Sequence, residues 1–389
     1  MPAGPEEPSL STTRSTMSDL RRLAAHPATT ALLALLFVLL LGFIFSGDGA
    51  FYKWTTHRDA LRQASVFGIL ACGMTLVIIT AGIDLSVGSV LALVAVTFSL
   101  FAIHWRWSPW LAIPACLAVG TACGAVSGGI IAKLRIQPFI MTLAMMVFAR
   151  GLAKTVSGGM KVSTAVANDD GTYTYVDVPQ IFRMIDAPLS DTVESLQARI
   201  ADCLMSMGSH LGLEWVVESY VQAQYWVYQT FGIRAVCDNV STVTIVFLVC
   251  VIVSWILLSR LRWGRYLYAI GGNEEAARLS GVPVTAMKIL AYGAAGLFAA
   301  VAGLCQAAQE QQGDPEAGTA YELTAIAIVV IGGTNLMGGR GGIGLTLLGT
   351  LTIGYLEKIL SINAVPEAGR LMLTGIIIIA AVLLQRRRA

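Results

Sequence analysis

The chain has 389 residues, of which 56% are hydrophobic and only 13% charged, with a net charge of +2 at pH 7. Soluble globular domains carry about 25% charged residues, so this composition, with a mean hydropathy of +0.70, excludes an ordinary soluble protein and predicts an all-α integral membrane protein. The net charge itself says little about partners, and no nucleic-acid partner is expected.

Ten apolar runs follow one another along the chain after a tail, residues 1–27, that is rich in Pro, Ser and Thr. Each run is close to the roughly 20 residues that a membrane-spanning helix needs. The first run is long for a signal peptide and no clear cleavage site follows it, so we expect an uncleaved span. The ten spans are expected at about residues 28–46, 63–82, 84–103, 109–132, 138–155, 241–259, 287–308, 321–337, 342–360 and 370–385.

The orientation of these spans follows from the basic residues in the short loops, which favour the cytoplasmic side. Lys133 and Arg135 form one such cluster, the loop 260–288 holds another, and Arg386–Arg388 end the chain. Bases within residues 47–62 weaken the pattern locally. We therefore expect spans one to five over 28–155, spans six to ten over 241–389, and both termini in the cytoplasm.

The second and third spans meet at an acidic break, in the stretch GMTLVIITAGIDLSVGSVLAL that begins at Gly73. Asp84 is the only charge there, and Ser86 and Gly88 follow it. A membrane-level carboxylate normally faces protein, water or substrate, and short helices broken by glycine indicate a transport site. Two roles stay open for Asp84: a cap for the third span, which we favour, and a contact to substrate.

A second membrane-level acid, Glu322, opens the run YELTAIAIVVIGGTNLMGG. It is either a span-end carboxylate facing outer water or a substrate contact. Thr324 and Asn335 lie in the same run, and Gln306 and Gln309 end the preceding span; all four are candidates to line a path for a polar solute.

Residues 156–240 are too polar to span and form an insert on the expected outer side. Between residues 161 and 239 the insert holds ten acidic residues against four basic ones. Val193, Leu196, Ile200 and Leu204 recur at the spacing of an amphipathic helix, for which Asp191 is the expected cap. Two alternatives stay open for Cys203 and Cys237: a disulfide, if the compartment is oxidising, or two free thiols.

The cytoplasmic loop 260–288 predicts a short, well-capped helix. Gly271 and Gly272 break the chain, Asn273 is placed to cap the helix, and Glu274 and Glu275 fall in its favourable first turn. Gly281 and Pro283 end the helix. Such a helix is suited to docking on a partner, although a plain surface connector explains it too.

Enzymatic and metal sites are not expected. The GxGxxG match at 339–344 lies between two spans and lacks a preceding strand, so a tight turn explains it better than a dinucleotide site. The chain has no Walker A sequence, no Ser/His/Asp or Cys/His arrangement and no Cys/His cluster at metal spacing. If ATP is used, another polypeptide must hydrolyse it.

Four stretches, in order, resemble the membrane permease subunits of bacterial ABC importers for monosaccharides of the ribose, xylose, arabinose and galactofuranose type. They are the Asp84 stretch, QPFIMTLAMMVFARGLA from Gln137, AIGGNEEAARLSGVPV from Ala269 and YELTAIAIVVIGGTNLMGGRGG from Tyr321. The insert 156–240 departs from the family, whose members have a much shorter loop there.

The resemblance implies a multi-pass protein of the bacterial inner membrane that works with a second permease subunit (as homodimer or heterodimer), a cytoplasmic ATPase that carries ATP and Mg²⁺, and a periplasmic sugar-binding protein. It places Asp84 and Glu322 near the translocation path. It also implies that the ATPase docks on the coupling segment, in which the matching residues are Gly271, Asn273, Glu274, Glu275, Ala277 and Gly281. The alternatives from the residues alone are a proton-coupled secondary transporter and a membrane enzyme.

Overall fold

The computed structural model describes residues 27–167, 172–211, 217, 219, 222 and 237–386, and the secondary structure within these ranges is almost entirely helical. The one sheet recorded in them is a short antiparallel pair with Val166 opposite Thr174. The predicted all-α class is confirmed. The elements are α2 (Pro27–Ile44), η1 (Ala50–Tyr52), α3 (Trp54–Ile79), α4 (Val87–Ser99), η2, a π-helix (Leu100–His104), α5 (Pro109–Leu134), α6 (Pro138–Ser157), β1 (Ala165–Ala167), β2 (Tyr173–Tyr175), α7 (Gln180–Asp186), α8 (Leu189–Leu211), α11 (Thr242–Ser259), α12 (Arg262–Gly272), α13 (Glu274–Leu279), α14 (Val284–Glu310), α15 (Tyr321–Gly332), α16 (Ile343–Ile362) and α17 (Glu367–Arg386).

Eight helices in the described part of the chain are long and apolar enough to cross a membrane, namely α2, α3, α4 together with η2, α5, α6, α11, α14 and α16. The ninth expected span, 321–337, is shorter than predicted, because α15 has only 12 residues and ends where Gly333 adopts a φ of +104°. The tenth expected span lies within α17. The chain is therefore a polytopic helical membrane protein.

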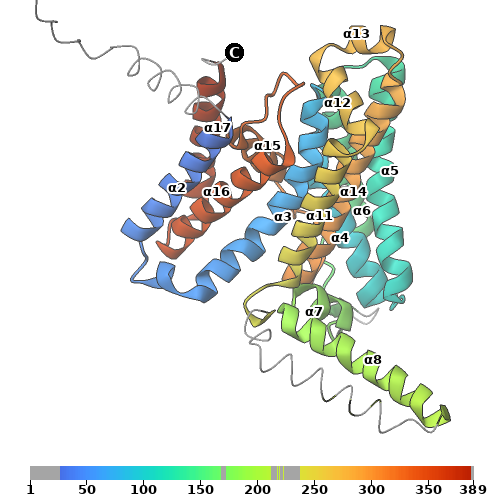
Figure 1. Ribbon diagram of the computed structural model, residues 1–389. Coiled ribbons are helices and arrows are strands. Elements are labelled where there is room, and N and C mark those ends of the chain that lie inside the picture. Colours follow the sequence, from blue (N-terminus) through green and yellow to red (C-terminus); the bar gives the residue numbers. More distant parts are fainter. Residues whose placement is uncertain are drawn as a thin grey trace, which may run out of the picture.

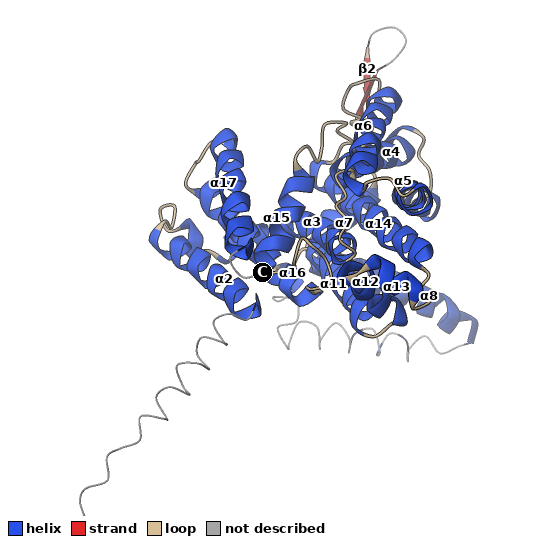
Figure 2. Cartoon of the chain, turned by 90° about the horizontal axis from the view of Figure 1, so that it is seen from above, coloured by secondary structure: helices blue, strands red, loops and turns tan. Residues whose placement is uncertain are grey.

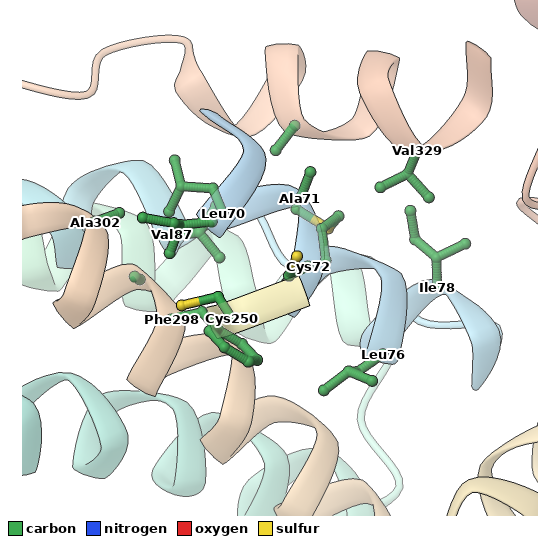
Figure 3. Packing of buried hydrophobic residues seen from close by; sticks show 14 of the residues in the cluster. Leu70, Ala71, Cys72, Leu76, Ile78, Val87, Cys250, Phe298, Ala302 and Val329 are labelled. Carbon is green, nitrogen blue, oxygen red and sulfur yellow. The ribbon is translucent and has the colours of Figure 1, made fainter. Parts of the chain in front are cut away.

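Helices α3, α4 and α14 form the centre of the molecule, and α14 packs against α3, α4 and α5. Figure 3 shows part of the buried cluster that they share, with Ile78 of α3 near Val329 of α15, Leu70 of α3 near Val87 of α4, and Phe298 and Ala302 contributed by α14. Most residues of α2, α6 and α11 are not buried, and the exposed ones are largely apolar, as lipid-facing helices require.

The contact between α5 and α14 is made backbone to backbone. A Cβ on Gly124 would overlap the carbonyl oxygen of Tyr292, and one on Gly120 would lie 2.6 Å from the carbonyl oxygen of Gly296. Glycines four residues apart allow two membrane helices to approach this closely. The two glycines of α5 therefore let the backbone of α14 pack directly against that of α5.

The two ends of the helical bundle differ. Figure 1 shows α12 and α13 at one end and α7 and α8 at the other. Seen from above, α2 and α17 lie on one side of α3 and α15, and α4, α5 and α6 on the other (Figure 2). The described part of the insert and the expected coupling segment therefore lie at opposite ends of the bundle.

The insert is attached to the bundle through α7. Phe182 is fully buried and stacks on Phe98 of α4 with ring centroids 4.8 Å apart. Arg62 of α3 donates two hydrogen bonds to the Asp186 carboxylate, at 2.6 and 2.5 Å. The amphipathic helix expected next is present as α8. Its predicted cap is wrong, because α8 begins at Leu189 and places Asp191 in its first turn.

Candidate functional site

Asp84 lies in the break between α3 and α4, and only 1% of it is exposed. Its Oδ1 accepts hydrogen bonds from Ser86 N at 2.8 Å and Ser86 Oγ at 2.6 Å. Ser86 itself is the N-cap residue of α4, and its side chain makes no capping bond. Asp84 therefore closes a turn ahead of the helix, which corrects the expectation that it caps the exposed N–H groups of the first turn.

The surroundings of Asp84 are polar but incompletely bonded. Asp84 Oδ2 and Tyr292 Oη are both buried and have no hydrogen-bond partner among the described residues. The Tyr292 hydroxyl lies against Gly82, where a Cβ would overlap it. A buried polar atom without a hydrogen-bond partner lowers the stability of the folded state. The packing of the rest of the protein must therefore hold the α3–α4 break in this conformation.

Gly88 and Glu322, which lie far apart in the sequence, meet in the structure. A Cβ on Gly88 would lie 2.5 Å from Glu322 Oε2 and would also overlap the carbonyl oxygen of Gly318. Gly88 belongs to the first turn of α4 and Glu322 to the first turn of α15. The carboxylate therefore lies at the N-terminal ends of two helices, where a negative charge is stabilised.

The segment that leads into α15 runs back along α4. A Cβ on Gly313 would lie 2.7 Å from the carbonyl oxygen of Ala95, and one on Gly318 would lie 2.6 Å from that of Gly88. From Ala95 to Gly88 the helix axis covers about 10 Å at 1.5 Å per residue. Irregular backbone at membrane depth is tolerated where protein covers it. The segment 313–318 thus re-enters the bundle beside α4.

Arg150 of α6 satisfies this re-entrant segment. Its Nη1 donates to the carbonyl oxygens of Pro315 at 2.6 Å and Ala317 at 2.7 Å. These two carbonyls belong to irregular backbone and accept no helix or sheet hydrogen bond within the described residues. The guanidinium therefore supplies the hydrogen-bond donors that lipid cannot provide.

Two ion pairs tie the re-entrant segment to the last turn of α6 and to the residues that follow it. Lys154 pairs with Glu316 at 2.5 Å, and Lys161 with Asp314 at 2.9 Å. The hydrogen bond and the charge of Asp314 raise the pKa of Lys161. Although partial burial raises the pKa of Asp314, bonds from Lys161 and from the Glu316 N–H outweigh it and hold that pKa below its ordinary value.

The other expected path residues are not brought to the same place. Thr324 lies one turn into α15, and its hydroxyl donates back to Ala320 O at 3.5 Å. Asn335 lies beyond the opposite end of α15, where its Oδ1 accepts from Met337 N in a turn. Gln306 donates to Glu310 and Gln309 to the backbone of Arg62. The structure therefore groups Gly88 with Glu322, and Asp84 with Ser86, whereas Asn335 lies in the turn beyond Gly333.

The expected coupling segment forms as predicted around its cap. Asn273 Oδ1 accepts from Ala276 N at 2.9 Å and begins α13, and Gly281 ends the following turn with a φ of +83°. Glu274 pairs with Lys288 of α14 at 2.7 Å, which fastens α13 to the bundle. Ala277 is the buried residue of α13.

The outward surface of α13 is small and partly apolar. Leu279 is 81% exposed, and Glu275 and Ala276 are exposed beside it. Of the six residues expected to couple, Asn273, Glu275 and Gly281 are exposed, whereas Gly271 and Glu274 are half-buried and Ala277 is buried.

The remaining expectations concern cysteines, the glycine-rich turn and metals. Cys203 and Cys237 are both free, one exposed and one buried, so the disulfide alternative is not realised in the structure. Residues 339–342 form the turn between α15 and α16, as expected. Within the described ranges no group of three His, Cys, Asp or Glu residues is placed to hold a metal ion.

Sequence reasoning missed Arg150 and Tyr292. Arg150 was visible as a lone arginine in an apolar span, and a membrane-level charge is itself a functional signal. Tyr292 carried no comparable signal, because a tyrosine in a membrane helix is ordinary until its hydroxyl is found buried.

Comparisons with known proteins place this site in context. Residues 58–382 match the family model described as branched-chain amino acid transport system / permease component. The ribose import permease protein of Escherichia coli strain K12 is 36% identical over 92% of this chain and 93% of its own length. The fructose import permease protein of Rhizobium meliloti is 31% identical over 92% and 85%, and the xylose transport system permease protein of E. coli K12 is 33% identical over 90% of both. No solved structure matches this chain.

Proposed function

This chain belongs to the family of permease components of branched-chain amino acid transport systems, and we propose that it is the transmembrane permease subunit of an ATP-driven importer for a monosaccharide. The observation that carries the proposal is the similarity to sugar import permeases over about nine-tenths of the chain. It covers the α3–α4 break, the re-entrant segment and the coupling segment together.

The chemistry of the bundle supports an uncharged, hydroxyl-rich solute. Arg150 is engaged by backbone carbonyls, and one oxygen of Asp84 is engaged by Ser86. A neutral sugar is held by a few placed hydrogen-bonding groups rather than by strong charges. The contact of Gly88 with Glu322, where two helix N-termini converge, is the place in the bundle that we assign to the path.

The coupling segment gives the proposed direction of the mechanism. α13 would lie in the cytoplasm and dock through Leu279 and Glu275 on a separate ATPase subunit, which supplies ATP and Mg²⁺. The opposite end, with α7 and α8, would face the periplasm and a sugar-binding protein. A second permease subunit, identical or not, would complete the path within the bacterial inner membrane.

Changing Leu279 to Asp tests the docking surface. A charge at the centre of an apolar contact loses the buried area and must be desolvated, so the variant should no longer co-purify with the ATPase subunit of the importer. Met160→Asp is the matched control, because Met160 is also an exposed apolar residue, 68% exposed, but lies just after α6, at the other end of the bundle. Equal co-purification of both variants with the ATPase would contradict the assignment of α13.

Uptake of radiolabelled ribose, fructose and xylose by cells that carry or lack the gene tests the substrate class. We expect loss of uptake of at least one of the three sugars in the deletion strain and recovery on complementation. Unchanged uptake of all three, in cells that grow on them through no other system, would contradict the sugar assignment.

A further inference from the structure

Three segments meet backbone to backbone at the end of α3, where Ile79, Gly271 and Gly339 form what we call the Ile79 junction. The carbonyl oxygen of Ile79, left free by the end of the helix, accepts a hydrogen bond from Gly339 N at 3.0 Å. A Cβ on Gly271 would overlap this same oxygen and would lie 2.5 Å from Gly339 N. The last turn of α12 is therefore seated directly on the end of α3.

The turn between α15 and α16 closes the junction from its other side. A Cβ on Gly338, which has a φ of +82°, would lie 2.7 Å from Ala81 N. Tyr268 of α12 donates from its hydroxyl to the carbonyl oxygen of Gly341 at 2.9 Å. Ala81 itself adopts a φ of +59°, which is unusual for a residue with a side chain. α12 and this turn thus hold a strained corner of the chain between them.

The junction stands between the coupling segment and the path. On one side, α12 continues through Asn273 into α13. On the other side, the chain leaves Ile79, passes Asp84 and begins α4, whose Gly88 contacts Glu322. No side chain separates α12 from α3 at this point, and close-packed atoms transmit a displacement instead of absorbing it.

We propose that the Ile79 junction is the mechanical link by which movement of α12 and α13 reaches the α3–α4 break, with Gly271 as its positioning residue. The inference rests on the proposed function, since it presumes a partner that moves α13. It goes beyond docking, because it assigns how the movement enters the membrane domain: through Ile79 and the corner at Ala81, toward Gly88 and Glu322.

The neighbouring glycine provides a matched control. Gly271 and Gly272 end the same helix, but a Cβ on Gly272 meets nothing within 4 Å. Gly271→Ala therefore pushes α12 away from Ile79, whereas Gly272→Ala adds the same methyl group to open space. Helix propensity changes equally in both variants, so any difference between them reports the contact.

The experiment reconstitutes the full importer, with its ATPase subunit and binding protein, in proteoliposomes and measures labelled sugar taken up per ATP hydrolysed. The probe is whichever of ribose, fructose and xylose the wild type imports fastest. For Gly271→Ala we expect ATP hydrolysis to continue while uptake per ATP falls about tenfold, in the range of typical coupling energies. Gly272→Ala should match the wild type.

Tyr268→Phe keeps the test decisive if Gly271→Ala does not fold. It removes one hydrogen bond to Gly341 without a steric clash, and uptake per ATP should fall about threefold, as for the loss of one ordinary hydrogen bond. Wild-type uptake per ATP in every folded variant would overturn the proposal. A wild-type importer that shows no ATP-driven uptake would instead contradict the proposed function, so the two failures are distinguishable.

Discussion

Asp84 and Glu322 are the two acids expected near the path from the sequence, and each is held at the start of a helix. Asp84 binds backbone and side chain of Ser86, whereas the Glu322 carboxylate lies against Gly88. Asp84 is buried, with 1% of it exposed, whereas Glu322 lies where α4 meets the re-entrant segment. Of the two, Glu322 is therefore the better placed to meet a solute, and Asp84 to hold the shape of the break.

Substituting Asp84 separates these roles. Asp84→Asn keeps an oxygen acceptor for both Ser86 bonds, whereas Asp84→Leu leaves the buried Ser86 N–H and hydroxyl without a partner, at about 1–3 kcal/mol each. We expect near-normal sugar uptake and a near-normal apparent Tm for Asp84→Asn. For Asp84→Leu we expect reduced uptake and a lower apparent Tm. If Asn and Leu lose uptake equally while both remain folded, the charge itself is required and a purely structural role is wrong.

The pair Asp314–Lys161 predicts a pH dependence of stability. The folded pKa of Asp314 lies below its ordinary value of 3.8, so its stabilisation is present above that value and is lost as the pH falls through the folded pKa. The folded pKa of Lys161 lies above 10.5, so its stabilisation is present below that value and is lost as the pH rises through the folded pKa.

Asp314→Asn checks this sign in apparent Tm scans of the purified protein between pH 7 and pH 3. The asparagine keeps the acceptor for Glu316 N but removes the charge. We expect the wild type to be the more stable at pH 7 and its advantage to shrink as the pH approaches 3. An advantage that stays constant over this range would mean that the pair does not contribute to stability through its charge.

At the scale of elements, the α5–α14 contact depends on the absence of side chains. Gly124→Ala would drive a methyl group into the carbonyl of Tyr292, and overpacking of this kind costs about 1–3 kcal/mol. Gly129, in the same helix, has nothing within 4 Å of its Cβ position. We expect Gly124→Ala to lower the apparent Tm and Gly129→Ala to leave it unchanged or raise it; equal Tm values would show that the helices can separate without cost.

The re-entrant segment depends in the same way on Arg150. Arg150→Met keeps the apolar stem but leaves the carbonyls of Pro315 and Ala317 without their donor, and we expect a lower apparent Tm together with reduced uptake. Lys154→Met is the control, because it removes only an exposed ion pair with Glu316, which is worth about 0–1 kcal/mol. A Tm loss from Lys154→Met as large as that from Arg150→Met would contradict the anchoring role.

Local features of these elements were predictable from the sequence, and contacts between them were not. The cap at Asn273 was found because capping involves residues three apart. The start of α8 was missed because Leu189 begins it through backbone bonds that carry no residue signature. The contact between Gly88 and Glu322 depends on how α15 packs against α4. No local pattern of residues in a single sequence predicts such a contact between distant helices.

At the scale of the whole molecule, composition predicted the helical membrane class, which the structure bears out. The length of the ninth span was overestimated, because hydropathy extended α15 through residues 333–337, whereas Gly333 ends the helix. The insert 156–240 is the part that was expected to depart from the family. Its α7 is built into the bundle through Phe182 and Asp186.

The central claim is that a separate ATPase drives this chain, and vesicle uptake tests it most directly. Proteoliposomes that contain the chain with its ATPase and binding protein should import labelled sugar when ATP is supplied to the ATPase side, and should not when ATP is omitted. Proteoliposomes that contain the chain alone should not import sugar when a proton gradient is imposed. Proton-driven uptake by the chain alone would contradict the account.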